Sequence, residues 1–247
     1  MKLLDLTLPS PAENLALDEA LLDWCETGVG KEVLRFWESH EYFIVVGYAN
    51  KVCAEVNRAA CKSMGIPIYR RCSGGGSVLQ GPGCLNYTLV LKTMEAGPLQ
   101  NISSTNRFIM DKNRGAIETL IPESRTRGSV SRVAVRGHTD LCLGNMKFSG
   151  NSQRRRNTYL LFHGTFLLNL DLVLIGNLLP VPSRQPDYRV DRAHDRFLTN
   201  LNLPAEKVKT ALRKAWKDEG RVTEPPLDRV KVLVRDKYAS AKWNHKF

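Results

Sequence analysis

The sequence predicts an α/β (α+β) fold in which helices flank a mixed β-sheet. Its 247 residues are 43% hydrophobic and 25% charged, the balance of a globular chain able to bury a sizeable core. Helix signals and clustered strand-like runs are mixed along the chain, as in proteins that pack helices on a sheet. No internal repeat, low-complexity tract or flexible linker divides the sequence. We therefore expect one domain over residues 1–247.

The clearest helix signal is Ser10-Pro11-Ala12-Glu13, which combines an N-cap serine, an N1 proline and a glutamate that closes a capping box. This helix should stop near Gly28. Cys84–Leu91 is apolar nearly throughout, as expected for a strand covered on both faces. Val181–Arg196 is rich in proline and arginine and should be irregular, with a helical part after it. The other predicted strands are Val33–Trp37, Phe43–Val46, Met146–Phe148 and Tyr159–Leu168, and the other predicted helices span 54–64, 106–120, 205–217 and 227–238.

The composition also indicates the cellular compartment of the protein. No apolar run is long enough to cross a bilayer, and the N-terminus resembles neither a signal peptide nor a transit peptide. We therefore expect a cytoplasmic protein with no membrane partner. The six cysteines form no Cys-x-x-Cys pair, so reduced thiols are expected and a metal site is not.

The net charge of +11 is concentrated between residues 123 and 156. A basic surface attracts nucleic acid, membranes or acidic proteins, although a solvated face without function is also open. Nucleic-acid binding is disfavoured because Phe148 is the one aromatic residue in that stretch and stacking needs several.

The most informative segment is Arg70-Arg71-Cys72-Ser73-Gly74-Gly75-Gly76, which continues to Gly83. Consecutive glycines allow the backbone to approach a ligand closely, and the two arginines carry donors suited to phosphate or carboxylate. Together they indicate an anion pocket, most simply for a nucleotide phosphate. A turn-forming loop without a ligand is the alternative.

A second segment holds a lysine in a strand-like setting. If Met146–Phe148 is extended, Met146 and Phe148 face one way and Lys147 the other. Such a lysine is held rigidly and could place its ammonium between two anionic reactants. An exposed lysine on an edge strand is the alternative.

Three ordered blocks resemble the lipoate–protein ligase A family, within the biotin/lipoate ligase superfamily. They are Arg70–Gly76, Lys147-Phe148-Ser149-Gly150-Asn151-Ser152-Gln153, and His163-Gly164-Thr165. The phosphate loop of many other ATP-using enzymes is absent, as is the signature of biotin ligases. The resemblance covers most of the chain and implies the biotin/lipoate protein ligase-like catalytic fold.

The resemblance implies a two-step reaction. Lipoate or octanoate and ATP, with Mg²⁺, first give the acyl-adenylate, and a lysine of an acceptor lipoyl-domain protein then takes the acyl group. Lys147 would contact both the carboxylate and the α-phosphate, where negative charge builds up. By family match the nucleotide and acyl pocket would be lined by Arg71, Gly74, Gly75, Gly76, Ser77, Val78 and Leu79, with Asn86 and Asp140 contributing through adenine or Mg²⁺.

The sequence also departs from the family. Many members carry His-Asp where this chain has Gln80-Gly81, and many carry a C-terminal accessory domain that we do not expect here. A separate accessory subunit would then be a partner, beside the often acidic acceptor. The basic stretch Pro122–Arg136 is expected to be a lid that shields the adenylate from water. Arg154-Arg155-Arg156 is expected to be a solvated or acceptor-facing patch, and His163 a core histidine with its hydrogen bonds satisfied.

Three other functions remain open. An octanoyltransferase would move the acyl group between carrier proteins without ATP, but it needs a cysteine nucleophile, and only Cys72 lies beside the expected pocket. A basic binding module is a second alternative. A non-catalytic binder of the acyl-adenylate or of the acceptor is a third.

Overall fold

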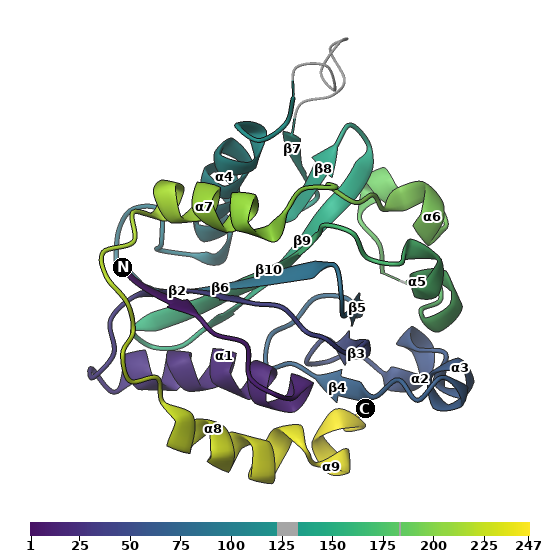
Figure 1. Cartoon of the computed structure of the whole chain (residues 1–247), viewed down its shortest axis with the longest axis horizontal. Coiled ribbons are helices and arrows are strands. Elements are labelled where there is room, and N and C mark those ends of the chain that lie inside the picture. The colour runs from purple at the N-terminus through teal and green to yellow at the C-terminus, as the bar shows by residue number, and fades with distance from the viewer. Residues whose placement is uncertain (123–132, 183) are drawn as a thin grey trace.

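A seven-stranded mixed sheet forms the centre of the computed structural model, which describes residues 1–122, 133–182 and 184–247. The strand order is β1-β2-β6-β10-β9-β8-β7; β1 and β2 run parallel and the other neighbours antiparallel. A smaller sheet of order β4-β3-β5 lies beside it (Figure 1). The expected mixed sheet with flanking helices is confirmed. The strands are β1 Lys2–Asp5, β2 Val33–Trp37, β3 Phe43–Val46, β4 Ile68–Arg70, β5 Val78–Gln80, β6 Cys84–Lys92, β7 Val133–Arg136, β8 Asp140–Leu143, β9 Met146–Arg155 and β10 Tyr159–Leu167.

Helices cover both faces of the large sheet (Figure 1). α4 and α7 pack together on one face, and α1 with α8 lies on the other. α5 packs near the small sheet, on α3 and β5. The helices are α1 Pro11–Glu26, α2 Val52–Glu55, α3 Arg58–Ser63, α4 Ile102–Glu118, α5 Leu172–Leu178, α6 His194–Phe197, α7 Ala205–Trp216, α8 Leu227–Leu233 and α9 Ala241–Asn244, with short turns at Asp187–Arg189 and Val234–Tyr238.

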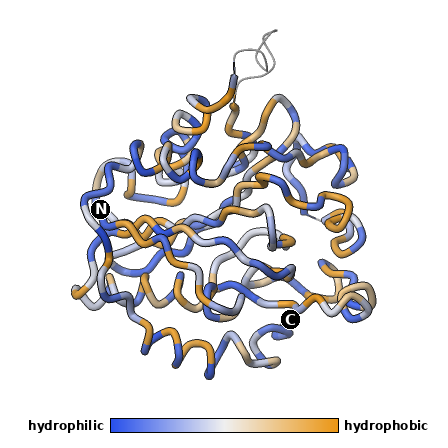
Figure 2. Tube along the Cα trace, in the orientation of Figure 1, coloured by the Kyte–Doolittle hydropathy of each residue, from blue (hydrophilic) through white to orange (hydrophobic). Residues whose placement is uncertain are grey.

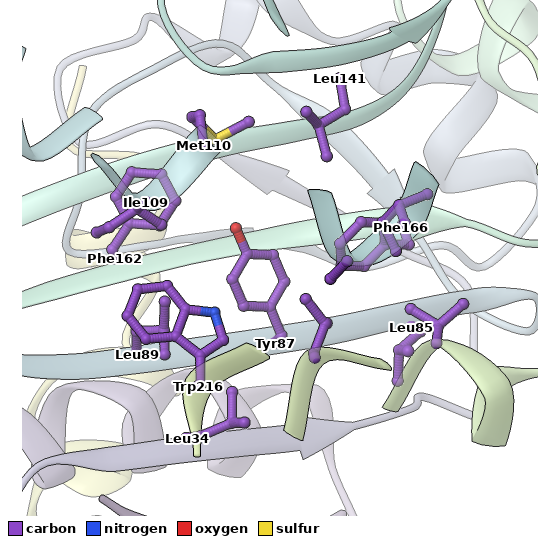
Figure 3. Close-up of a cluster of buried hydrophobic side chains, with 14 of the residues drawn as sticks. Leu34, Leu85, Tyr87, Leu89, Ile109, Met110, Leu141, Phe162, Phe166 and Trp216 are labelled. Carbon is purple, nitrogen blue, oxygen red and sulfur yellow. The ribbon is translucent and has the colours of Figure 1, made fainter. Parts of the chain in front are cut away.

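The hydrophobic core has separate parts on the two faces of the large sheet. The part under α4 and α7 includes Tyr87, Phe162, Phe166 and Trp216 (Figure 3). The part under α1 is built from the buried leucines and alanines of that helix. A third cluster joins the small sheet to α5. Along α8 hydrophobic and hydrophilic residues alternate, which suits a helix with one buried face (Figure 2).

Most predicted elements are confirmed. Ser10 caps α1 and forms the capping box with Glu13, and β2 and β3 have the predicted bounds. α4 begins earlier than predicted because Asn101 supplies its cap through a hydrogen bond from Ser104 N.

One element prediction was wrong, and a second was wrong over the part that the structure describes. The helix predicted over 54–64 is two short helices, because Val56 is extended and Asn57 starts a new cap. Residues 133–136 of the expected lid form β7, which pairs with β8, while 123–132 lie outside the described residues. Within the described ranges, no helix combines the length and the apolar character needed to cross a membrane.

Gly83 makes a close backbone contact that a side chain would prevent. Its φ is +88°, and an added Cβ would lie 2.2 Å from the carbonyl oxygen of Asn169. The Gly83 carbonyl accepts hydrogen bonds from the amides of Leu168 and Asn169. The turn between β5 and β6 is therefore fixed against the end of β10.

We expect Gly83→Ala to lower the free energy of unfolding by roughly 2–3 kcal/mol, because both the backbone conformation and the contact with Asn169 are strained. Urea denaturation measures this. Gly97→Ala is the matched control, since Gly97 has φ +93° but nothing within contact distance, and should cost only about 1 kcal/mol. Equal losses in the two variants would show that the contact with Asn169 does not matter.

Candidate functional site

A cavity of about 940 Å³ opens on the face of the large sheet that carries α1. Its walls come from α1, the glycine-rich segment, β5, the strands β2, β6, β9 and β10, and the segment from Leu179 to Phe197. The volume is at the upper end of pockets that hold drug-sized ligands. The cavity can therefore accommodate a nucleotide-sized molecule.

Two rows of side chains cross the sheet on this face. Residues directly opposite each other on paired strands point to the same side, and so do residues two apart on one strand. The strand registers therefore place both rows toward α1. One row is Arg35, Thr88, His163 and Ser152, and the other is Trp37, Asn86, Thr165 and Gly150.

Asp18 of α1 binds the first row. Its carboxylate is 2.6 Å from Arg35 Nη1 and 2.9 Å from His163 Nδ1, and it accepts a hydrogen bond from Thr88 Oγ1 at 2.8 Å. Burial alone would raise the pKa of Asp18, but attraction to Arg35 and the bonds from His163 and Thr88 outweigh it and lower this pKa. The buried carboxylate is therefore held ionised.

His163 connects Asp18 to the glycine-rich segment. Its Nε2 lies 2.6 Å from Ser73 Oγ while its Nδ1 faces Asp18, so both ring nitrogens have partners. The expected satisfied histidine is found, and it also lines the cavity. Ser73 is thus fixed to the central strands.

Lys147 points into the cavity and is held by a carboxylate from β8. Its Nζ is 2.8 Å from Asp140 Oδ1, and Tyr188 donates a hydrogen bond to Asp140 Oδ2 at 2.7 Å. Burial raises the pKa of the Tyr188 hydroxyl, so it stays a donor at neutral pH. A Cβ on Gly150 would lie 2.8 Å from Lys147 Nζ, so the absence of a side chain there makes room for the ammonium. The predicted strand lysine is confirmed, with Phe148 buried on the opposite side.

The two arginines differ from expectation. The Arg70 side chain is fully buried and donates to the carbonyl oxygens of Gly47, Tyr48, Asn50, Trp243 and Asn244. Its charge is therefore not presented to a ligand, and the prediction of a phosphate-binding role for Arg70 was wrong. The reason is that the turn after β3 and the C-terminal segment converge on it, which local sequence does not reveal.

Arg71 lines the cavity but also shapes the glycine-rich segment. It donates to the carbonyl oxygens of Gly74 and Gly76 and to Ser73 Oγ. Burial lowers the pKa of Arg71 to about 10. Gly75, with φ +85°, would bring a Cβ within 2.9 Å of Arg71 Nη2, so glycine suits this position.

The structure gathers most of the predicted site residues around one cavity. Gly74 and Leu79 do not line it: the Gly74 carbonyl accepts from Ser152, and Leu79 packs in the core beneath the small sheet. Leu79 faces away because its neighbours Val78 and Gln80 on β5 face the cavity. The predicted residues that do line it are Arg71, Gly75, Gly76, Ser77, Val78, Asn86, Asp140 and Lys147.

Sequence reasoning missed other residues of the cavity. Asp18, Trp37 and Tyr188 all line it. No local motif marks them, because strand pairing and the return of the chain after Leu179 bring them there. Gln80 carried a signal in its departure from the family pattern, and it too lines the cavity.

The arginines at 154–156 differ in exposure: Arg154 and Arg155 are half-buried and Arg156 is exposed. Arg154 donates to the Cys72 carbonyl, Arg155 to Thr105 and the carbonyls of Leu99 and Gln100, and Arg156 to Asp23. The predicted solvated patch was therefore wrong for Arg154 and Arg155, which join β9 to neighbouring elements, while Arg156 is exposed as expected.

No thiol lines the cavity. All six cysteines lie in the described part of the chain, and Cys72 beside the glycine-rich segment is buried. Burial raises the pKa of Cys72 to about 11, which disfavours a thiolate. Among the described residues no group of three or more His, Cys, Asp or Glu side chains is arranged to hold a metal ion.

Comparison with known proteins assigns the family. The model of the lipoyl protein ligase A/B catalytic domain matches residues 10–217. The chain therefore belongs to this family of catalytic domains, and it is an enzyme of the group that contains lipoate–protein ligases and octanoyltransferases.

Two relatives represent the two activities. Octanoyltransferase LipM of Bacillus subtilis (strain 168) is 29% identical over 269 residues, which cover 96% of this chain and 95% of that protein. Lipoate-protein ligase A subunit 1 of Thermoplasma acidophilum is 26% identical over 244 residues, which cover 94% of this chain and 90% of that protein.

Solved structures confirm the fold. A lipoate-protein ligase A bound with ATP superposes with a TM-score of 0.79 at 24% identity, covering 99% of this chain and 98% of that one. A bipartite lipoate protein ligase from T. acidophilum, studied with its E2 lipoyl domain, has a TM-score of 0.78 at 23% identity. The match covers 99% of this chain and 95% of that one.

The buried carboxylate of Asp18 should make the free energy of unfolding depend on pH in the acid range. A carboxylate whose folded pKa lies below its ordinary value of 3.8 stabilises the fold above that value, and the contribution is lost as the pH falls through the folded pKa. Asp18→Asn should lower the free energy of unfolding by roughly 3–5 kcal/mol at pH 7, because Arg35 is left unpaired. The difference from the wild type should shrink below pH 3.8.

Urea denaturation between pH 7 and pH 2.5 measures the effect. Asp111→Asn, at an exposed carboxylate on α4, is the control and should keep the wild-type pH dependence. A constant difference between Asp18→Asn and the wild type over the whole pH range would contradict the assignment.

Proposed function

We propose that this chain activates lipoate or octanoate with ATP and transfers the acyl group to a lysine of a lipoyl-domain acceptor. The observation that carries the proposal is the Lys147 ammonium, fixed by Asp140 inside a nucleotide-sized cavity that no thiol lines. The family match and the ATP-bound structural neighbour support it.

The geometry suits attack of a carboxylate on the α-phosphate. Two anions must approach each other, and charge builds up on the phosphate oxygens as they do. Lys147 is held on a strand and paired through one oxygen of Asp140, whose other oxygen is occupied by Tyr188. The ammonium therefore needs little reorganisation to bridge the acyl carboxylate and the α-phosphate.

The other residues predicted at the site would hold the two substrates. The backbone at Gly75 and Gly76, with Ser77, would face the phosphates, while Val78 and Leu15 give the cavity an apolar wall for the acyl chain. Mg²⁺ would be held mainly by the phosphates of ATP, as is usual when a site offers one or two carboxylates. When bound, it would neutralise charge on the departing pyrophosphate.

We also propose the partners and the location. The basic surface suits an acidic lipoyl-domain acceptor, whose binding salt would weaken. The T. acidophilum ligase is bipartite, which supports a separate accessory subunit for this chain. A cytoplasmic location stays a prediction.

The second candidate function is ATP-independent octanoyl transfer, which the LipM relatives favour. In that reaction a thioester donor replaces ATP, and a covalent route would need a cysteine nucleophile. None of the six cysteines lines the cavity, which disfavours such a route, although the buried Cys142 Sγ lies 3.5 Å from the hydroxyl of the lining residue Tyr188.

ATP–pyrophosphate exchange dependent on lipoate or octanoate tests adenylation directly. We expect exchange by the wild type and a loss of roughly 100- to 1,000-fold in Lys147→Ala, because the charge that bridges the reactants is removed. Lys231→Ala, at an exposed lysine on α8, should exchange like the wild type. Transfer from an octanoyl thioester without any exchange by the wild type would instead establish the second candidate.

Tyr188→Phe should reduce the exchange rate by roughly 10-fold, since Asp140 loses one charge-assisted hydrogen bond and holds Lys147 less firmly. Steady-state kinetics of exchange measure this. Tyr42→Phe is the matched control, because Tyr42 packs at the small sheet outside the cavity lining. A Tyr188→Phe variant as active as the wild type would remove Tyr188 from the site.

A further inference from the structure

Three buried polar atoms in the cavity wall have no hydrogen-bond partner among the described residues: Trp37 Nε1, Gln80 Oε1 and Asn86 Nδ2. The residues are 2%, 7% and 3% exposed. An unpaired buried polar group costs about 1–3 kcal/mol. Their grouping around one cavity therefore points to a ligand that supplies the missing partners.

Gln80 and Asn86 are joined through one hydroxyl. Gln80 Nε2 donates to Thr165 Oγ1 at 2.8 Å, and Thr165 Oγ1 donates to Asn86 Oδ1 at 2.7 Å. This leaves one free acceptor and one free donor. In the structure Thr165 donates to Asn86, and in this orientation the free acceptor is on Gln80 and the free donor on Asn86.

Asn86 of the amide pair lies on the same face of the large sheet as the Lys147 ammonium, two strands away, and Gln80 joins it from β5 through Thr165. Thr165 is directly opposite Gly150 on the neighbouring strand, and Asn86 is directly opposite Thr165. The Lys147 Nζ lies over Gly150, 2.8 Å from the place of its missing Cβ. The donor and the acceptor are therefore on the same face as the ammonium, where an activated acyl group would be held.

We propose that Gln80 and Asn86 serve the second step, the attack of the acceptor lysine on the acyl-adenylate; this rests on the proposed function. The free N–H of Asn86, which is directly opposite Trp37 on the neighbouring strand, binds the acyl carbonyl oxygen as it becomes negative. The free oxygen of Gln80 accepts a hydrogen bond from the attacking nitrogen and directs its lone pair at the carbonyl carbon.

The step balances without another reactant. The acceptor lysine enters as the neutral amine, the new C–N bond forms, and the bond from the acyl carbon to the phosphate oxygen breaks. AMP leaves, and the proton lost by the nitrogen departs with the phosphate into solvent. Gln80 does not take the proton, because an amide oxygen is not basic enough to do so. Its role is to orient the amine.

The test separates the two steps by supplying preformed octanoyl-AMP. Single-turnover transfer is measured to an apo E2 lipoyl domain and to Nα-acetyl-lysine amide, which offers the amine without a protein surface. Gln80→Met keeps the size but removes the acceptor, and should slow transfer to both amines by roughly 10- to 100-fold. ATP–pyrophosphate exchange should fall far less.

Other variants exclude a structural explanation. Gln80→Glu keeps an acceptor oxygen and should recover most of the transfer rate. Gln153→Met is the matched control, since Gln153 Oε1 is also buried without a partner but its amide bonds to α4 outside the cavity lining. Thermal melts show whether each variant is folded. If Gln80→Met does not fold, Thr165→Val removes the bridging hydroxyl and gives the same test.

The outcomes are distinct. Equal slowing of exchange and transfer would overturn the inference and assign the pair to nucleotide binding, and an unchanged transfer rate would assign the free atoms to bound water only. If the wild type transfers the acyl group from octanoyl-AMP but shows no ATP–pyrophosphate exchange, the proposed ATP dependence is overturned. The transfer rate of Gln80→Met would still test the role of Gln80 and Asn86. No wild-type transfer to either amine would overturn the inference.

Discussion

The buried carboxylate of Asp18 is the interaction on which the rest of the site depends. A charge without exposure is tolerated only when it is paired and hydrogen-bonded, and Asp18 is paired with Arg35 and bonded to His163 and Thr88. These partners come from three neighbouring strands, so one side chain of α1 fixes the helix over the sheet. Through His163 the same carboxylate fixes Ser73 and the start of the glycine-rich segment.

The glycine-rich segment is held by arginines that bind carbonyl oxygens. Arg70 joins the turn after β3 to the C-terminal segment, and Arg71 binds the carbonyls of Gly74 and Gly76. These contacts fix the backbone of the glycine-rich segment before a ligand binds. Such preorganisation favours the binding of an anion. Lys147, paired with Asp140, is a cation that the cavity presents from the large sheet.

The cavity contains groups suited to two successive reactions. In the proposed reaction Lys147 lies where two anions would meet, and the free amide donor of Asn86 lies on the same face of the sheet, two strands away. Lys147 and Asn86 are held by strands of the large sheet and Gln80 by β5 of the small sheet, and all three line one cavity.

The sequence by itself determined the fold class, most strands, the cap of α1, and Lys147 on its strand with the glycine-rich segment nearby. These follow from short-range patterns: alternating side chains, capping residues, and the spacing of the three family blocks. Only the tertiary structure decided which polar groups meet. Arg70 is buried by the returning C-terminus, Asp18 and Tyr188 reach the site from distant segments, and Gln80 meets Asn86 through Thr165. Such contacts depend on strand order and register, which bring together residues that no local pattern relates.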